Sequence, residues 1–259
     1  MFELLQKMEE KQFYHQIQKV LDSLPENFSI LEEQIDIDIQ VKYFETANKI
    51  RKRANSEKYF ENRDELFLPE VDLERKRKIL LVIAAIDDVK AFRTIEKFVA
   101  VAEGEIKQWA VLAMQESRML IQSSLLEEQQ VFISTGLGGK GQKLRYYVVF
   151  INKKQNKILT VTQQKLLKDE LIYQINQYGG EFESMDFSEE FSTVLVMLPL
   201  QTDLKKVFRS IIDECNQYGD FLDDDMIVTN VKVMSRNEIL EMLKQNREEE
   251  FEDFEELDE

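Results

Sequence analysis

The chain has 259 residues, of which 43% are hydrophobic and 32% are charged, and its formal net charge at pH 7 is −16. One cysteine, Cys215, excludes an internal disulfide and a cysteine-cluster metal site. One histidine, His15, excludes histidine-rich metal sites and most nucleophile–histidine catalytic arrangements. We therefore expect a globular cytoplasmic protein that is not an enzyme and that uses no cofactor or metal.

Hydropathy and charge give two further expectations. The longest apolar run, "ILLVIAAI" at 79–86, is far shorter than the roughly 18 to 20 residues that cross a bilayer, and the N-terminus lacks the pattern of a secretory signal. From Gln245 onward nine acidic residues accompany a single basic one, Arg247. The remaining body is mildly acidic, so its charge argues only weakly against a nucleic acid partner.

Helical spacing dominates the first 128 residues. Residues 35–43 fit both the alternation of a strand and the spacing of a helix, and because the following "ETANKIRKRA" favours helix, we expect a helix. Residues 56–71 lack a period and read as a connector. Residues 73–128 are predicted to be helical, with an N-cap in the pair at 87–88 and an interruption at Gly104. Another helix is predicted from the stripe Phe2, Leu5, Met8, Phe13, Ile17 and Leu21.

The helices predicted between 73 and 128 have apolar sides that face one another, and Trp109 is assigned to their core. This pattern resembles the helix pairs of HEAT-like α-solenoids, without a repeat of fixed period. A plain helical bundle fits the same pattern. Residues 1–128 are therefore predicted to form a helical region of one kind or the other.

Residues 129–245 show strands and helices in alternation. Strands are predicted at 144–151, 181–187, 192–200 and 226–234, and helices at 160–178, 204–218 and 235–245, the last with a Ser-x-x-Glu capping box. The order strand, helix, strand, strand, helix, strand resembles the ferredoxin-like split βαβ fold. That fold hosts metabolite sensors, RNA-binding domains, metal carriers and adaptors, so it names no function. We predict an α+β fold, with a ferredoxin-like domain after the helical region.

One more strand, "VFIST" at 131–135, does not fit this order. The strand at 144–151 is central in a ferredoxin-like sheet, so 131–135 cannot pair with it along its whole length. Either the two form a hairpin that projects past the sheet as a β-arm, or the sheet has another strand order. The strand at 192–200 has no aromatic residue, which departs from the pattern of RNA-recognition domains.

Four of the eight glycines lie within six positions between these two strands. The spacing is not that of a P-loop, which needs Gly-Lys-Ser/Thr opening a helix. One interpretation is a hairpin connection that uses glycine to turn. The other is a mobile loop that binds an anionic macromolecule through backbone N–H groups and cations. The loop consists of Gly136, Gly138, Gly139, Lys140, Gly141, Lys143 and Arg145.

Two other segments are candidates for binding. The residues 246–259 are predicted to be an acidic disordered tail, which either only solubilises the protein or docks through Phe251, Phe254 and Leu257. A secondary basic patch either binds an acidic partner or is a solvated helical face. It consists of Arg51, Lys52, Arg53, Arg75, Lys76, Arg77 and Lys78.

The resulting hypothesis is a non-enzymatic adaptor whose glycine-rich, cationic β-arm engages an unidentified protein partner. One alternative is a factor associated with RNA or the ribosome, and another is a small-molecule sensor similar to ACT domains, working as a homodimer. No membrane partner is expected.

Overall fold

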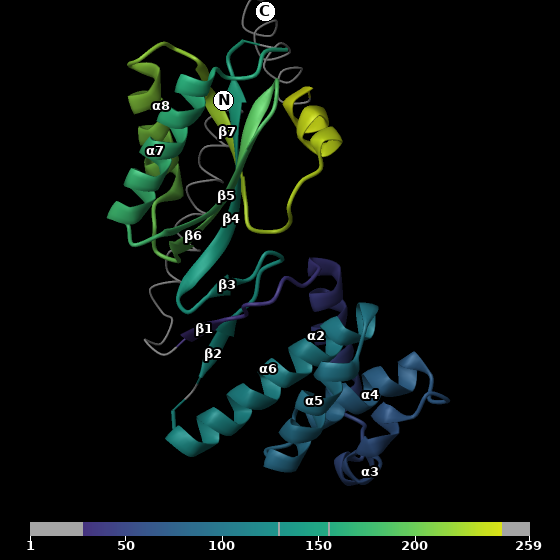
Figure 1. Ribbon diagram of the computed structural model, residues 1–259. Helices are drawn as coiled ribbons and strands as arrows, with labels where there is room; N and C mark the ends of the chain where they lie inside the picture. The colour runs from purple at the N-terminus through teal and green to yellow at the C-terminus, as the bar shows by residue number, and fades with distance from the viewer. Residues whose placement is uncertain (1–27, 129, 155, 245–259) are drawn as a thin grey trace, which may run out of the picture.

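The computed structural model describes residues 28–128, 130–154 and 156–244. Figure 1 shows a group of helices next to an antiparallel sheet, with a two-stranded sheet between them. The elements of the helical part and the two-stranded sheet are β1 (Phe28–Ile30), α2 (Ile37–Arg51), α3 (Ser56–Glu61), η1 (Arg63–Phe67), α4 (Leu73–Ile83), α5 (Val89–Val101), α6 (Gly104–Leu126) and β2 (Val131–Ile133).

Aspartates start three of these helices. Asp36, Asp72 and Asp88 each accept a hydrogen bond from a backbone N–H in the first turn of α2, α4 and α5. This is the capping that the sequence predicts at residues 87–88. The ambiguous segment at 35–43 is helical from Ile37, so the expectation of a helix there is confirmed. The expected connector at 56–71 contains the short helices α3 and η1.

The helices α2, α4 and α5 all contact the long helix α6. Their apolar sides form one core, in which Trp109 is 3% exposed, as expected. Among the described residues, no helix is both long and apolar enough to cross a membrane.

The larger sheet belongs to the second half of the chain. Its elements are β3 (Gly139–Lys140), β4 (Lys143–Asn152), α7 (Val161–Gln177), β5 (Glu181–Phe187), β6 (Phe191–Pro199), α8 (Leu204–Asn216) and β7 (Leu222–Thr229), and residues 236–244 add a helix at the end. The strand order β7-β4-β6-β5, with every pair antiparallel, is that of the ferredoxin-like fold. The predicted α+β fold is confirmed.

The strand expected at 131–135 pairs differently from both possibilities that the sequence left open. β2 leaves the larger sheet and pairs in parallel with β1, with Phe28 opposite Val131. The short β3 takes the place beside the beginning of β4, with Lys140 opposite Lys143, and β7 pairs with the remainder of that edge from Tyr147. The hairpin of β3 and β4 therefore does not project as an arm.

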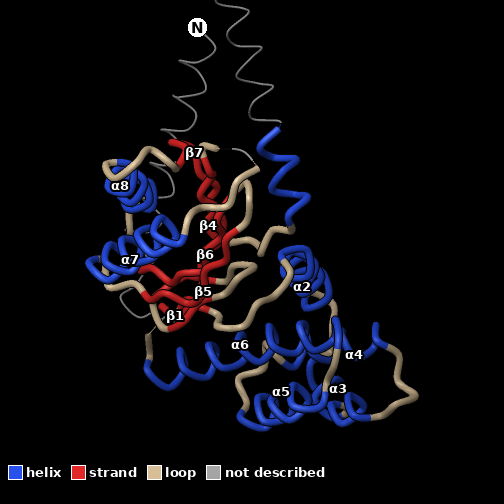
Figure 2. The backbone as a smooth tube through the Cα atoms, turned by 45° about the horizontal axis from the view of Figure 1, so that its top comes forward, coloured by secondary structure: helices blue, strands red, loops and turns tan. Residues whose placement is uncertain are grey.

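One face of the larger sheet is covered by helices, and the last helix covers part of the other (Figure 2). The face with Tyr146, Val148 and Phe150 packs against α7 and α8. The opposite face, with Tyr147 and Val149, packs against the helix at 236–244. Ser235 and Glu238 form the predicted capping contacts at the start of that helix.

Both boundaries of the last strand differ from the predicted 226–234, because β7 spans Leu222–Thr229. β7 begins at Leu222, four residues before the predicted start at 226, and includes Asp223, Asp224 and Asp225. These aspartates lie on an edge strand, where charged side chains are tolerated and block pairing with other chains. The guanidinium group of Arg209 in α8 contacts both the side-chain carboxylate and the backbone carbonyl oxygen of Asp224.

Candidate functional site

The glycine-rich loop is packed between distant parts of the chain. A Cβ built on Gly136 would lie 1.6 Å from the carbonyl oxygen of Val231, which follows β7. A Cβ on Gly138, whose φ is 65°, would lie 2.6 to 2.9 Å from the carbonyl oxygens of residues 31–33. The glycines are needed because neighbouring backbone occupies the space of a side chain.

Backbone hydrogen bonds hold the loop on both sides. The Leu137 N–H donates to the Asn230 carbonyl at 3.0 Å, and the Gly139 N–H donates to the Leu31 carbonyl at 3.0 Å. Gln40 of α2 donates from Nε2 to the Thr135 carbonyl at 3.2 Å. The loop therefore joins the helical part to the sheet, and the expectation of a mobile loop on a β-arm is wrong.

Two of the three cations of the loop are paired within the protein. Lys143 Nζ lies 2.6 Å from Glu181 Oε1. Arg145 makes two hydrogen bonds of 2.6 and 2.8 Å to Glu183 and a third, of 2.7 Å, to the Leu137 carbonyl. The hydrogen bond to Glu183 raises the pKa of Arg145 above its ordinary value. Lys140 is exposed.

The secondary basic patch likewise contains some residues that form ion pairs within the protein and others that do not. Arg51 forms a bidentate pair with Glu116, with distances of 2.6 and 2.7 Å, and also donates to the Leu81 carbonyl. Arg75 pairs with Glu65, and Arg77 pairs with Glu74 and Glu105. The remaining members are partly or fully exposed, and no ion pair joins them to another described residue: Lys52, Arg53, Lys76 and Lys78.

A polar cleft of about 260 Å³ lies beside the loop, between the helical part and the sheet. Its most buried polar side chain, Gln115, donates to Ser29 Oγ at 3.2 Å and accepts from Arg118 at 3.5 Å. Both ends of this amide are used by the protein. The lining residues are Ser29, Ile30, Glu32, Glu33, Gln115, Arg118, Gln122 and Gly141.

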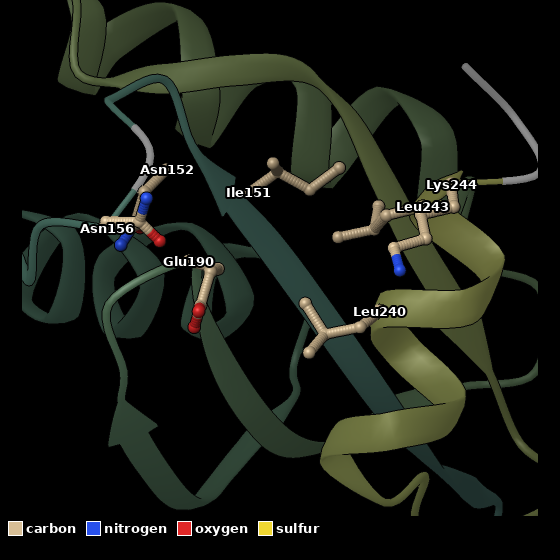
Figure 3. Close-up of a pocket in the computed structure, with 7 residues that line it drawn as sticks. All are labelled: Ile151, Asn152, Asn156, Glu190, Leu240, Leu243 and Lys244. Atoms are coloured by element: carbon tan, nitrogen blue, oxygen red, sulfur yellow. The ribbon is translucent and has the colours of Figure 1, made fainter. Parts of the chain in front are cut away.

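A second cavity, of about 220 Å³, lies at the end of β4 under the helix of residues 236–244 (Figure 3). Polar side chains line one side, and two leucines and a lysine reach in from the helix. We call this the sheet-end cavity; its lining consists of Ile151, Asn152, Asn156, Glu190, Leu240, Leu243 and Lys244.

Asn152, the last residue of β4, is the buried polar group of this cavity, with 2% of its surface exposed. Its Nδ2 donates to the carbonyl oxygens of Ser188 and Glu189, both at 3.1 Å. Its Oδ1 is buried and has no hydrogen-bond partner in the described part of the chain. Asn152 also lines a neighbouring cavity of about 190 Å³ at the start of α7.

The charged groups of the sheet-end cavity differ in their pairing. Glu190 accepts two hydrogen bonds, of 2.7 and 2.8 Å, from Nη2 of Arg236. Lys244 is exposed and forms no ion pair with a described residue. Within the described ranges, no group of three His, Cys, Asp or Glu side chains is placed to hold a metal ion.

The sequence interpretation did not single out this site. The sequence did contain a signal for this site. Asn152 is a polar residue that directly follows "LRYYVVFI", a run in which all residues except Arg145 are apolar or aromatic. A polar residue at the end of a buried central strand needs hydrogen-bond partners. The expected docking residues Phe251, Phe254 and Leu257, the acidic tail and the helix expected near the N-terminus lie outside the described residues.

No protein-family model matches the chain, and no curated protein matches it. Among solved structures, a "putative transposase" from Deinococcus radiodurans R1 is 18% identical, with a TM-score of 0.34; the match covers 40% of this chain and 90% of that one. A REP-associated tyrosine transposase bound to a REP hairpin is 13% identical, with a TM-score of 0.30, and the match covers 35% of this chain and 57% of that one.

These neighbours are described as enzymes, not as adaptors. The expectation of a non-enzymatic adaptor is corrected on that count, and also because the β-arm it depended on is packed into the protein. At these TM-scores the likeness transfers no activity to this chain.

Proposed function

We propose that the protein binds a small polar molecule in the sheet-end cavity. The observation that carries the proposal is the cavity of about 220 Å³, whose wall contains Asn152, a buried residue with an Oδ1 that has no hydrogen-bond partner among the described residues. Its amide orientation is set by the protein, because two carbonyl oxygens accept from Nδ2. This oxygen itself has almost no accessible surface, so a ligand in the cavity meets it only if the side chains around it shift.

Energetics supports the same interpretation. A buried polar atom without a hydrogen bond costs about 1 to 3 kcal/mol. A ligand that supplies the missing donor recovers this free energy, while Nδ2 of the same side chain continues to serve the carbonyl oxygens of Ser188 and Glu189. The cavity has the composition of a binding site, with an apolar floor and a few polar groups that converge on it.

The size of the cavity limits the occupant. Sites for drug-sized ligands measure about 300 to 1,000 Å³. The sheet-end cavity, of about 220 Å³, is below this range and suits a molecule of a few to about ten heavy atoms. We therefore propose a metabolite-sized ligand and not a polymer for this site.

The proposal is tested by ligand-observed NMR on the purified protein with defined mixtures of amino acids, amines, organic acids, nucleosides and sugar phosphates. Leu240→Trp fills the cavity, and Asn152→Leu removes its acceptor together with the Nδ2 donors to Ser188 and Glu189, so circular dichroism first checks that this variant folds. Met242→Trp is the matched control, because Met242 lies on the exposed side of the same helix.

We expect at least one component to bind the native protein and the Met242→Trp variant, and to lose binding in the other two. Binding also raises the free energy of unfolding by RT ln(1 + [L]/Kd), which raises the melting temperature. The proposal is wrong if no component binds, or if binding survives Leu240→Trp.

The partners expected from the sequence, a protein, RNA or a second copy of the chain, stay predictions. The cytoplasmic location, expected from the single cysteine, belongs to this proposal, because it gives access to soluble metabolites.

A further inference from the structure

We infer that the acidic tail, residues 246–259, docks on the protein's own surface and places a phenylalanine in the cavity of about 190 Å³ at the start of α7. This is a second site, and the inference does not depend on what binds in the sheet-end cavity. We call it the α7 cavity; its lining includes Lys154, Lys157, Ile158, Leu159, Thr160 and Phe221.

Apolar side chains form part of the α7 cavity and lie exposed beside it. Leu159 and Phe221 are buried, whereas Ile158 is 47% exposed. Val161 and Tyr218, each next in the chain to a lining residue, are 83% and 75% exposed. Because a cavity of about 150 Å³ in another protein holds benzene, the α7 cavity is large enough for one phenyl ring. A ring that enters it also removes the surrounding apolar surface from water.

The same cavity carries positive charge. Lys154 and Lys157 are exposed, and no ion pair joins either of them to another described residue. Their neighbour Lys153 is paired with Asp220, which offsets the negative charge nearest to the cavity. The first turn of α7 contains no acidic residue, so the positive end of the helix dipole also favours an incoming carboxylate. The site therefore suits an occupant that is both aromatic and acidic.

The acidic tail has this chemistry. Phe251 and Phe254 lie among nine acidic residues, and Arg247 is the single basic residue of the segment. When one phenylalanine enters the cavity, the adjacent carboxylates come close to the two lysines and are attracted to them. This complementarity of charge and apolar surface favours the chain's own tail as the occupant.

The last described residues bring the tail to the site. Lys244 lines the sheet-end cavity together with Asn152 and Asn156 at the end of β4 (Figure 3). Asn152 also lines the α7 cavity, so the two cavities are adjacent. Phe251 follows Lys244 by seven residues, and an extended chain of that length spans up to about 23 Å. The tail is therefore long enough to cross from one cavity to the next.

Paramagnetic relaxation enhancement on the full chain tests the inference. A nitroxide attached to the variant Glu256→Cys broadens the NMR signals of backbone amides near the tail, and the native Cys215 is buried and takes no label. We expect the strongest broadening at residues 156–163 and 219–221. It should weaken as salt is raised to about 1 M, where the Debye length is about 3 Å.

Charge variants of the labelled protein assign the contact. Lys154→Gln combined with Lys157→Gln should reduce the broadening at these residues severalfold, because the cations that attract the tail are removed. Lys97→Gln combined with Lys107→Gln makes the same change of charge at exposed lysines of α5 and α6. This matched control should leave the broadening unchanged.

Phe251→Ser combined with Phe254→Ser tests the apolar half of the contact at constant charge. We expect the broadening at residues 156–163 to fall severalfold. Broadening that is unaffected by this variant, or that is centred on the secondary basic patch, would overturn the inference. Uniform weak broadening over the whole protein would overturn it as well.

A mixed sample tests whether the tail binds a second copy of the chain instead. Spin-labelled protein at natural isotope abundance is mixed with unlabelled protein enriched in nitrogen-15. We expect no broadening in this mixture, because the tail docks within its own molecule. Broadening of residues 156–163 in the mixture would show docking between copies and would contradict the inference.

Discussion

Gly136 and Val231 lie in van der Waals contact through their backbones, so closely that a Cβ on Gly136 would be 1.6 Å from the Val231 carbonyl oxygen and 2.6 Å from its carbonyl carbon. The contact joins the glycine-rich loop before β4 to the segment that follows β7 and leads into the helix of residues 236–244.

Replacing this glycine should destabilise the protein. Gly136→Ala forces two backbone segments apart, and we expect the free energy of unfolding to fall by about 3 kcal/mol or more. Gly141→Asn is the control in the same loop: nothing lies within 4 Å of its added Cβ, and asparagine tolerates the φ of 60°. Chemical denaturation measures both. Equal losses in the two variants would show that the close contact does not carry the effect.

The pair formed by Arg51 and Glu116 should stabilise the helical part. Tyr43, which is fully buried, donates from its hydroxyl to Glu116 Oε2 at 2.7 Å, and Arg51 binds both carboxylate oxygens. Glu116→Ala leaves the buried Tyr43 hydroxyl and the partly buried Arg51 guanidinium without their acceptor, and we expect a loss of about 2 kcal/mol.

The control for that prediction is Glu45→Ala. Glu45 pairs with Lys49 at 3.7 Å on the exposed side of α2, where such pairs contribute about 0.5 kcal/mol or less. Urea denaturation of both variants gives the comparison, and a similar small loss for Glu116→Ala would contradict the prediction.

Cys215 should be chemically silent in the folded protein. Burial raises the pKa of its thiol to about 12, with a further contribution from the negative charges of Glu170 and Glu214. We expect no reaction with a disulfide reagent such as DTNB at pH 8, and complete reaction in denaturant, because only the thiolate attacks. Tyr218→Cys places a thiol at a position that is 75% exposed and serves as the reactive control. Fast labelling of the native protein would contradict the burial of Cys215.

The start of the last helix should weaken in acid. Hydrogen bonds from Lys232, and then from Ser235, hold the pKa of Glu238 at about 2. The pKa is lowered on folding from its ordinary value of about 4.3, so the stabilisation is present above that value and is lost as pH falls from about 4 to about 2.

Amide hydrogen exchange of residues 236–244, followed from pH 5 to pH 2, measures this loss. Glu238→Ala, which removes the carboxylate and its contacts with Lys232 and Ser235, should show fast exchange already at pH 5, with little further dependence on pH from this group. Glu241→Ala, at an exposed carboxylate of the same helix, should retain the native profile. Identical profiles for the two variants would rule out the capping contact as the cause.

The periodic parts of the fold were accessible from the sequence. β5 matches its predicted bounds at Glu181–Phe187, and α8 shows the stripe of Val207, Phe208, Ile211 and Cys215 that faces the sheet. These patterns are local, because one face of each element is buried and the other is solvated.

The partners of irregular segments were not accessible in the same way. The clustered glycines indicated close backbone approach or a turn, but nothing in their spacing names residues 31–33 or Val231 as the neighbours. Arg51 appeared to be part of a basic surface because its acceptor, Glu116, is 65 positions away. The hydrophobic periodicity of an element predicts which of its faces is buried. The partner of a polar residue depends on contacts between residues that are distant in the sequence.

The parallel pairing of β1 and β2 makes the helical part a crossover connection. Phe28 lies opposite Val131, so the chain leaves and returns at adjacent strands after an excursion of about 100 residues. Closing so long a loop is entropically costly unless the helices between have already folded. Assembly should therefore proceed from the helices outward. Deleting the residues before 131 would remove β1 and leave β2 with exposed backbone N–H and C=O groups. Replacing the helices between the two strands by a shorter helical connection would keep the pair.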